Sequence, residues 1–245
     1  MDIVFLHGGA QNGSIWDETI AAMTLQEPGA HRCIVLDAPG CGSKRGMDTS
    51  AMSHEALVDA LVADVRAAGA SGAMLVGHSQ AGTALPAMIA QAPDLFAKVV
   101  YVSCVAPVPG GDMMETVLAI HAAPEAPLHG IFGNPDVPPM EQFSAMFCND
   151  MGPQQAKAFM ARLVEEGYPE SASTWDGWQY DHLTAIPSTY VLCLRDQILT
   201  PTAQEAFAVR FHCDTIVRID AGHQVQNTRP HALAEVLRLE AQPAS

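Results

Sequence analysis

A serine at the end of an apolar run is the first residue of this chain that could do chemistry. The run 73–76 predicts a short buried strand, and a helical pattern begins after Ser79. A serine on a sharp strand-to-helix turn is a nucleophile elbow, and small residues must stand two positions before and after it. Gly77 and Ala81 fill these positions, with alanine where glycine is usual. The pattern indicates a serine nucleophile; the alternative is a helix-capping serine.

A serine hydroxyl attacks well at neutral pH only when a base takes its proton and a carboxylate orients that base. Asp196 follows the fifth predicted strand, and His223 follows the sixth. Because the carboxyl ends of parallel strands meet at one edge of a sheet, we expect both side chains beside Ser79. The alternative acid is Asp220, which we interpret as the end of the sixth strand, and the alternative base is His182.

Attack on a carbonyl also requires donors for the negative oxygen that develops. Two backbone N–H groups form such an oxyanion hole. We expect one from Gln80, which follows the nucleophile, and one from Gly9, in the loop after the first strand. Gly8 would allow close backbone approach, although a tight turn alone also explains these glycines. We expect His78 to shape the elbow and, with Gly8, to border the substrate pocket.

The elements that must position these residues alternate between strands and helices. Short turns between such units imply the α/β class, with a doubly wound, mainly parallel six-stranded sheet. Ser14 is expected to cap the first helix, and Pro86 to kink the helix after the elbow. The predicted strands are 3–6, 33–36, 73–76, 99–102, 188–194 and 215–219, and the predicted helices are 14–23, 53–69, 80–91, 201–211 and one that begins at Pro230.

This alternation stops between residues 107 and 185. A structureless loop of that length is improbable in a compact domain, so we expect helices there. We predict a core formed by 1–106 and 186–245, with a helical cap at 107–185 inserted into it. The helix-like pieces of the cap are about 112–121, 140–148 and 153–166, separated by proline-rich loops.

The predicted cap is rich in methionine and aromatic residues. Methionine adapts to varied apolar groups and suits a substrate pocket. Packing between cap helices is nevertheless the preferred interpretation for most of this set: Met113, Met114, Met140, Phe143, Met146, Phe147, Phe159 and Met160. Trp175 and Trp178 lie near the return to the sheet and are candidates to line the substrate pocket, with core packing as an equal alternative.

Composition excludes several classes of partner. Twelve Lys and Arg against 27 Asp and Glu give a net charge of −15, which argues against nucleic acid and anionic membranes. No apolar run approaches the about 20 residues of a membrane helix. The first strand begins at once, so we expect no signal peptide. The six cysteines are scattered singly, which favours reduced thiols, a cytoplasmic location and no metal site.

The order of these motifs resembles that of the α/β-hydrolase superfamily, and the resemblance covers essentially the whole chain. It rests on His7-Gly8-Gly9, the elbow serine, the acid after the fifth strand and Gly222-His223 after the sixth. The resemblance implies that Ser79, Asp196 and His223 form a catalytic triad. It also implies a cofactor-free active site under a helical cap.

A narrower resemblance is to the branch that contains plant methyl esterases, plant hydroxynitrile lyases and bacterial esterases such as pyrethroid hydrolases. It rests on the abrupt start at the first strand, Gly13 and Trp16 in the following segment, and the stretch 101–110 before the cap. Lyases of this branch resemble one another in a threonine after the first-strand histidine and a lysine after the catalytic histidine. Gly8 and Gln224 stand at these positions, and both departures favour the esterase.

The expected function is therefore that of a serine hydrolase that cleaves a carboxylic ester with an apolar portion through an acyl-enzyme. One alternative is a hydroxynitrile-lyase-like enzyme, or another cofactor-free lyase on the same scaffold. A second alternative is a ligand-binding homologue with low turnover. The expected partner is a small-molecule ester, and a homodimer is considered only by analogy with the fold.

Overall fold

The computed structural model describes residues 1–163 and 167–242, and it is built around a six-stranded sheet in which every neighbouring pair is parallel. The predicted class and sheet are confirmed. The spatial order is β2-β1-β3-β4-β5-β6. The strands are β1 (Asp2–Leu6), β2 (Arg32–Leu36), β3 (Ala73–His78), β4 (Phe96–Val102), β5 (Ser188–Cys193) and β6 (Thr215–Ile219).

The strand order reverses direction between β1 and β3. The chain passes from β1 to β2 on one side and then crosses to β3 on the other, so the loops that follow β1 and β3 diverge. In such sheets the crevice at this point is where ligands bind. The register pairs Leu6 with Gly77, which brings the loop after β1 beside the end of β3.

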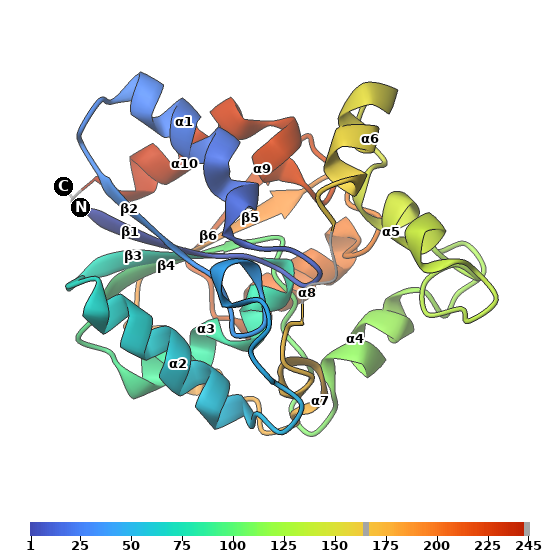
Figure 1. The fold of residues 1–245 in the computed structure, drawn as a ribbon, viewed down its shortest axis with the longest axis horizontal. Helices are drawn as coiled ribbons and strands as arrows, with labels where there is room; N and C mark the ends of the chain where they lie inside the picture. The colour runs from blue at the N-terminus through green and yellow to red at the C-terminus, as the bar shows by residue number, and fades with distance from the viewer. Residues whose placement is uncertain (164–166, 243–245) are drawn as a thin grey trace.

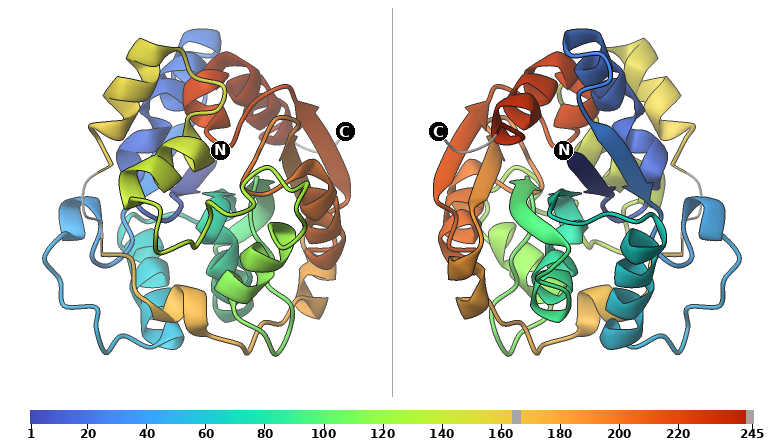
Figure 2. Two further views of the ribbon diagram at one scale, coloured as in Figure 1. Left: turned by 90° about the vertical axis from the view of Figure 1, so that its right-hand side faces the viewer. Right: turned by 90° about the vertical axis from the view of Figure 1, so that its left-hand side faces the viewer.

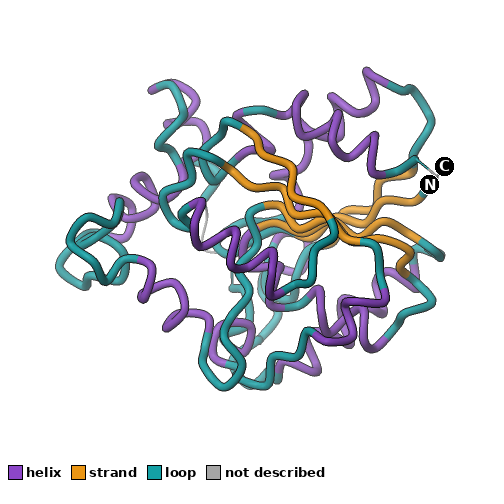
Figure 3. Tube along the Cα trace, turned by 180° about the vertical axis from the view of Figure 1, so that it is seen from behind, coloured by secondary structure: helices purple, strands orange, loops and turns teal. Residues whose placement is uncertain are grey.

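Helices cover both faces of the sheet (Figure 1). One face carries α1 (Asp17–Gln26), α9 (Val225–Thr228) and α10 (Pro230–Glu240), and the other carries α2 (His54–Ala67), α3 (Leu85–Gln91) and α8 (Pro201–Arg210). Successive strand side chains point to opposite faces, so Phe5 packs under the first group and Leu6 under the second. Figure 3 shows the sheet between the two helical layers from behind.

The stretch between β4 and β5 contains helices and, in its described residues, no strand. Its elements are α4 (Met113–Ile120), α5 (Pro139–Phe147), α6 (Pro153–Met160), α7 (Ser171–Thr174) and the 3-10 helix η4 (Asp181–Ala185). The α-helices α4 to α7 lie beyond the carboxyl ends of the strands, as the two side views of Figure 2 also show, whereas η4 packs against α3 and leads into the amino end of β5. The helix predicted at 153–166 ends at Met160, and residues 164–166 lie outside the described residues. The division into core and cap stays a proposal.

Two local predictions were wrong. Asn12, not Ser14, caps the first helical segment: its side chain accepts from the Ser14 N–H at 3.0 Å and begins the 3-10 turn η1 (Gly13–Trp16) ahead of α1. Pro86 does not kink a continuous helix. A 3-10 turn, η3 (Ser79–Thr83), follows the elbow, and α3 starts afresh with Pro86 in its first turn, where a missing N–H is tolerated.

None of the helices in the described residues is long and apolar enough to span a membrane. The cysteines in the same residues form no disulfide.

Candidate active site

Ser79 stands at the apex of the turn between β3 and η3, in a conformation that few serines adopt. Its φ is 54°, in the left-handed region, which is unfavourable for a residue with a Cβ. A Cβ added at Gly77 would lie 2.6 Å from Leu85 Cδ2 and 2.9 Å from the methyl of Ala81. Glycine at 77 therefore leaves the space that alanine at 81 uses, which explains why the elbow accepts alanine there.

The structure brings the three predicted residues Ser79, Asp196 and His223 into one hydrogen-bonded chain. His223 Nε2 lies 2.9 Å from Ser79 Oγ, and His223 Nδ1 lies 2.6 Å from Asp196 Oδ2. An ionised carboxylate only accepts, so Nδ1 carries the proton and Nε2 is free to accept from the serine hydroxyl. This is the arrangement that general-base activation of a serine requires.

The Asp196 carboxylate is buried, with 3% of the residue exposed, and it accepts four hydrogen bonds. Oδ1 accepts from the N–H groups of Ile198 and Leu199 at 2.9 and 3.0 Å, and Oδ2 accepts from His223 and from Ser103 Oγ, the latter at 2.6 Å. These four donors occupy the lone pairs of the two carboxylate oxygens and so stabilise a buried negative charge.

Ser103 is a member of this site that the sequence analysis missed. It follows β4 directly, it is fully buried, and its φ of 42° turns the chain sharply at the strand end. The rule that selected Asp196 and His223, a polar residue in the loop that follows an apolar strand, would also have selected Ser103.

His78 lies beside His223 rather than in the pocket, with the two ring centroids 4.7 Å apart. It is fully buried, and its Nε2 donates to the backbone oxygen of His223 at 2.9 Å. Burial, and next the neighbouring His223, lower the pKa of His78, so its ring is neutral at neutral pH. The prediction that His78 borders the pocket was wrong, because the side chain of a strand's last residue points into the fold here.

The loop after β1 lies against Ser79. A Cβ on Gly8 would stand 2.9 Å from Ser79 Cβ, and one on Gly9 would stand 2.1 Å from Gln80 Oε1. His7 fixes this loop: its Nδ1 bonds the Gly8 carbonyl at 2.8 Å. Gly9 and Gln80 line the pocket beside Ser79, whereas Gly8 is buried next to the Ser79 Cβ and is not part of the lining, contrary to the prediction that it borders the pocket. The role of the N–H groups of Gly9 and Gln80 as an oxyanion hole stays a prediction.

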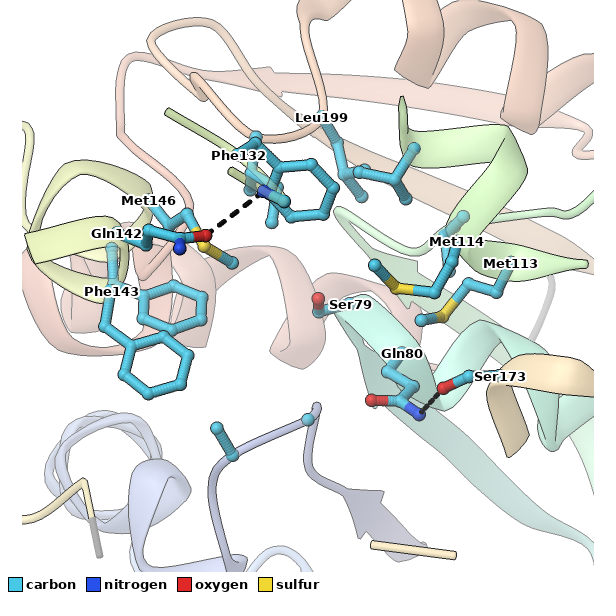
Figure 4. Close-up of a pocket in the computed structure, with 17 residues that line it drawn as sticks. Ser79, Gln80, Met113, Met114, Phe132, Gln142, Phe143, Met146, Ser173 and Leu199 are labelled. Carbon is cyan, nitrogen blue, oxygen red and sulfur yellow. Dashed lines mark hydrogen bonds between the residues drawn. The ribbon is translucent and has the colours of Figure 1, made fainter. Parts of the chain in front are cut away.

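A cavity of about 320 Å³ opens over Ser79 (Figure 4). In the figure Ser79 lies between Met113 and Met114 on one side and Phe143 and Met146 on the other. Of the described residues that line it, none is charged. The lining residues are Gly9, Ala10, Ser79, Gln80, Val105, Met113, Met114, Val117, Phe132, Gly133, Gln142, Phe143, Met146, Phe147, Ser173, Ile198 and Leu199.

The polar side chains in this lining are mostly bonded to the protein. Gln142 Oε1 accepts from the Gly133 N–H, and its Nε2 donates to two carbonyls of the loop before α5. Gln80 Nε2 donates to Ser173 Oγ at 3.0 Å. The pocket therefore offers a substrate an apolar surface with the serine hydroxyl at one side.

Several pocket predictions need correction. Five of the eight methionine and phenylalanine side chains assigned mainly to helix packing line the cavity: Met113, Met114, Phe143, Met146 and Phe147. Trp175 and Trp178, predicted to line it, border a separate hollow. Trp175 stacks on His54, with ring centroids 4.1 Å apart, and Trp178 Nε1 donates to the Gly111 carbonyl at 2.8 Å. Neither ring is among the residues that line the cavity over Ser79.

The alternative acid and base lie elsewhere. Asp220 is exposed and pairs with Arg195 at 2.7 Å, and His182 bonds the carbonyl of Pro86. Within residues 1–163 and 167–242 no group of three or more His, Cys, Asp or Glu side chains could hold a metal ion.

Comparison with known proteins agrees with this geometry. A family model described as "Alpha/beta hydrolase family" matches residues 3–236. Esterase Rv0045c of Mycobacterium tuberculosis (strain ATCC 25618 / H37Rv) is 26% identical over 260 residues, covering 96% of this chain and 81% of that protein.

Solved structures with the same fold include members of the predicted branch. An extracellular α/β-hydrolase from a Paenibacillus species, described as homologous to tobacco salicylic acid binding protein 2, aligns with a TM-score of 0.77 at 19% identity over all of both chains. Polyneuridine aldehyde esterase aligns with 0.77 at 15% identity, covering 98% of this chain and 99% of that one. The pyrethroid hydrolase PytH aligns with 0.72 at 22% identity, covering 98% of this chain and 97% of that one.

Proposed function

Because the chain belongs to the α/β-hydrolase family, we propose that its buried Ser79–His223–Asp196 chain is a catalytic triad and that the protein hydrolyses carboxylic esters. The observation that carries the proposal is the 2.9 Å contact between Ser79 Oγ and His223 Nε2 at the wall of an apolar cavity. The esterase and hydrolase names of several similar proteins support it.

In the first half of the reaction Ser79 Oγ attacks the ester carbonyl carbon while its proton passes to His223 Nε2. The carbonyl π electrons move to the oxygen, and the N–H groups of Gly9 and Gln80 bind that oxyanion. Asp196 stabilises the imidazolium through Nδ1. When the tetrahedral intermediate collapses, the C–O bond to the alcohol breaks and the leaving oxygen takes the proton from His223.

In the second half a water molecule takes the place of the alcohol. His223 removes a proton from this water as it attacks the acyl carbon, and the same oxyanion donors act again. Collapse breaks the bond to Ser79 Oγ, which regains its proton from His223. The carboxylic acid leaves, and the serine, histidine and aspartate return to their starting states.

The cavity supports a substrate with an apolar, uncharged portion. A charged substituent there would lose its hydration without gaining a partner, which costs several kcal/mol, about 2–7 even for a neutral polar group. Methionine and phenylalanine side chains can adjust to groups of different shape. Esters whose acyl or alcohol part is a neutral alkyl or aryl group fit this surface.

The lyase alternative has less support. Gln224, at the position of the lyase lysine, is fully buried, lies outside the cavity lining and accepts from Gln226 Nε2 at 2.6 Å. Among the described residues that line the cavity, no cationic side chain is present to hold a leaving cyanide. Three expectations remain predictions from the sequence alone: a cytoplasmic location, a homodimer and ligand binding with low turnover.

The test combines labelling with turnover. A fluorophosphonate probe should modify Ser79, identified by peptide mass spectrometry, and Ser79→Ala should lower kcat/KM for 4-nitrophenyl butyrate by about 10⁴-fold or more. Ser43→Ala is the control, because Ser43 is an exposed serine that does not line the cavity. Ester turnover by Ser79→Ala close to that of the wild type would refute the proposal.

A further inference from the structure

A short segment after α5 contacts the loops that carry both the acid and the base. We call residues 194–199, after β5, the acid loop and residues 220–224, after β6, the base loop. Asn149 Nδ2 donates to the carbonyl of Arg195 at 2.7 Å, one residue before Asp196. Asp150 Oδ2 accepts from the Gly222 N–H at 2.8 Å, one residue before His223.

The same segment begins with a ring that touches the base itself. Phe147, the last residue of α5, stacks on the His223 imidazole with centroids 5.7 Å apart and planes inclined by 25°. Three of the four consecutive residues 147–150 thus reach the acid loop, the base loop and the base. None of these contacts is needed to end α5, because the N–H group of its C-cap residue, Cys148, already donates to the Ser144 carbonyl within the helix.

The Asp150 carboxylate lies in an unusual environment. Its side chain is 1% exposed, and Arg229 stands 3.9 Å from Oδ2. Its other oxygen, Oδ1, has no hydrogen-bond partner among the described residues. A buried acceptor without a partner lowers the stability of the fold by about 1–3 kcal/mol. The fold keeps the bond from the Gly222 N–H to Asp150 Oδ2 in spite of this cost.

Gly222 allows the close approach. A Cβ at this position would lie 2.5 Å from Asn149 Oδ1 and 2.6 Å from Asp150 Oδ1. The φ of Gly222 is outside the left-handed region, so glycine provides space here rather than an unusual backbone conformation. A larger residue at this position would displace the ends of the Asn149 and Asp150 side chains, which make the two bonds to the loops.

We propose that Asn149 and Asp150 are positioning residues that hold the acid loop and the base loop together, so that Asp196 and His223 keep their 2.6 Å contact. The proposal rests on the proposed function for its kinetic consequence. Neither residue lines the cavity, so their removal should slow the chemical step and leave substrate binding nearly intact.

The chain supplies a matched control. Gln155 Nε2 donates to the carbonyl of Asn227 at 3.0 Å, again a side-chain amide bonded to a backbone carbonyl across the same interface. Asn227 lies on α9, outside both loops. Gln155→Ala therefore weakens the attachment of this part of the chain without releasing the acid or the base.

The experiment measures kcat and KM for 4-nitrophenyl butyrate together with urea unfolding. Asn149→Ala and Asp150→Ala should each lower kcat by about 10- to 100-fold, the effect of misplacing reacting groups by about 1 Å, with KM within about twofold of wild type. Asp150→Asn keeps an oxygen that accepts from Gly222 and should recover most of kcat. Gln155→Ala should leave kcat unchanged.

A second readout does not depend on ester turnover. The proton that His223 Nδ1 shares with Asp196 should give a low-field ¹H NMR signal in the wild type, and Asn149→Ala should weaken or shift it. Wild-type kcat in Asn149→Ala and Asp150→Ala, an unchanged signal, or an equal loss of kcat in Gln155→Ala would each overturn the proposal. A wild type that shows the signal but no ester turnover would instead refute only the proposed function.

Discussion

Replacement of Ser103 tests whether its hydroxyl is a buried hydrogen-bond donor that stabilises the Asp196 carboxylate. Ser103 Oγ donates to Asp196 Oδ2 at 2.6 Å in a place without solvent. A hydrogen bond to a charged group contributes about 1.5–3 kcal/mol, so Ser103→Ala should lower the free energy of unfolding by about 2 kcal/mol. His223 and two backbone N–H groups still bind the carboxylate, so kcat should fall by about 10-fold at most, or about 1.4 kcal/mol.

A second substitution separates the hydrogen bond from the backbone. The φ of 42° costs a residue with a Cβ about 1–2 kcal/mol, and glycine avoids this strain but loses more chain entropy on folding. Ser103→Gly lacks the same hydroxyl, and it should be about 0.5–1 kcal/mol more stable than Ser103→Ala.

Urea unfolding of both variants, with kcat measured on the same preparations, is the assay. The control is Ser43→Ala, which removes a similar bond, Ser43 Oγ to Asp37 Oδ2 at 2.7 Å, at an exposed position. Solvent replaces that bond, so its loss should cost under about 1 kcal/mol. If Ser103→Ala were no less stable than Ser43→Ala, the assignment of Ser103 as a buried donor to Asp196 would be wrong.

Two further predictions concern the loop after β1 and the histidine under the elbow. Gly8→Ala would press a methyl group against Ser79 Cβ and should lower kcat by about 100-fold, an effect as large as the loss of an oxyanion donor. The methyl group of Gly9→Ala would meet only the movable end of the Gln80 side chain, so kcat should fall much less. Equal losses of kcat in the two variants would contradict this reasoning. The lowered pKa of His78 means that the unfolded chain binds more protons below pH 6.5, so stability should fall with decreasing pH there by about 1.4 kcal/mol per unit, measured as urea midpoints against pH. His78→Gln, which keeps a donor to the His223 carbonyl, should lack that part of the slope.

The sheet and the residues at its carboxyl edge could be predicted because each depends on short-range pattern. Apolar runs marked all six strands, and a polar residue after a strand marked Ser79, Asp196 and His223. The strand order then brought them together, as parallel sheets do. Ser103 follows the same rule, and it was missed because a serine has many non-catalytic roles and no motif surrounds it.

The pocket could not be predicted in the same way. Which methionine faces the cavity depends on how α4 and α5 sit over the sheet, a long-range arrangement with no local signal. Trp175 illustrates this: its partner His54 lies over a hundred positions away in sequence, at the start of α2. Likewise, the contact between Asp150 and Gly222 joins loops that no periodicity links.

The strand order also sets the sequence of events in a chain made from its N-terminus. β2 pairs with β1 at one edge, β3 pairs with the other side of β1, and β4, β5 and β6 are then added outward in turn. Ser79 precedes His223 by 144 residues, which at about 5–20 residues per second is an interval of about 7–30 s. For that time the growing chain contains Ser79 without His223, the residue proposed to act as its base. On the proposed mechanism, the serine can gain its activity only after β6, an edge strand and the last to be made, has been added.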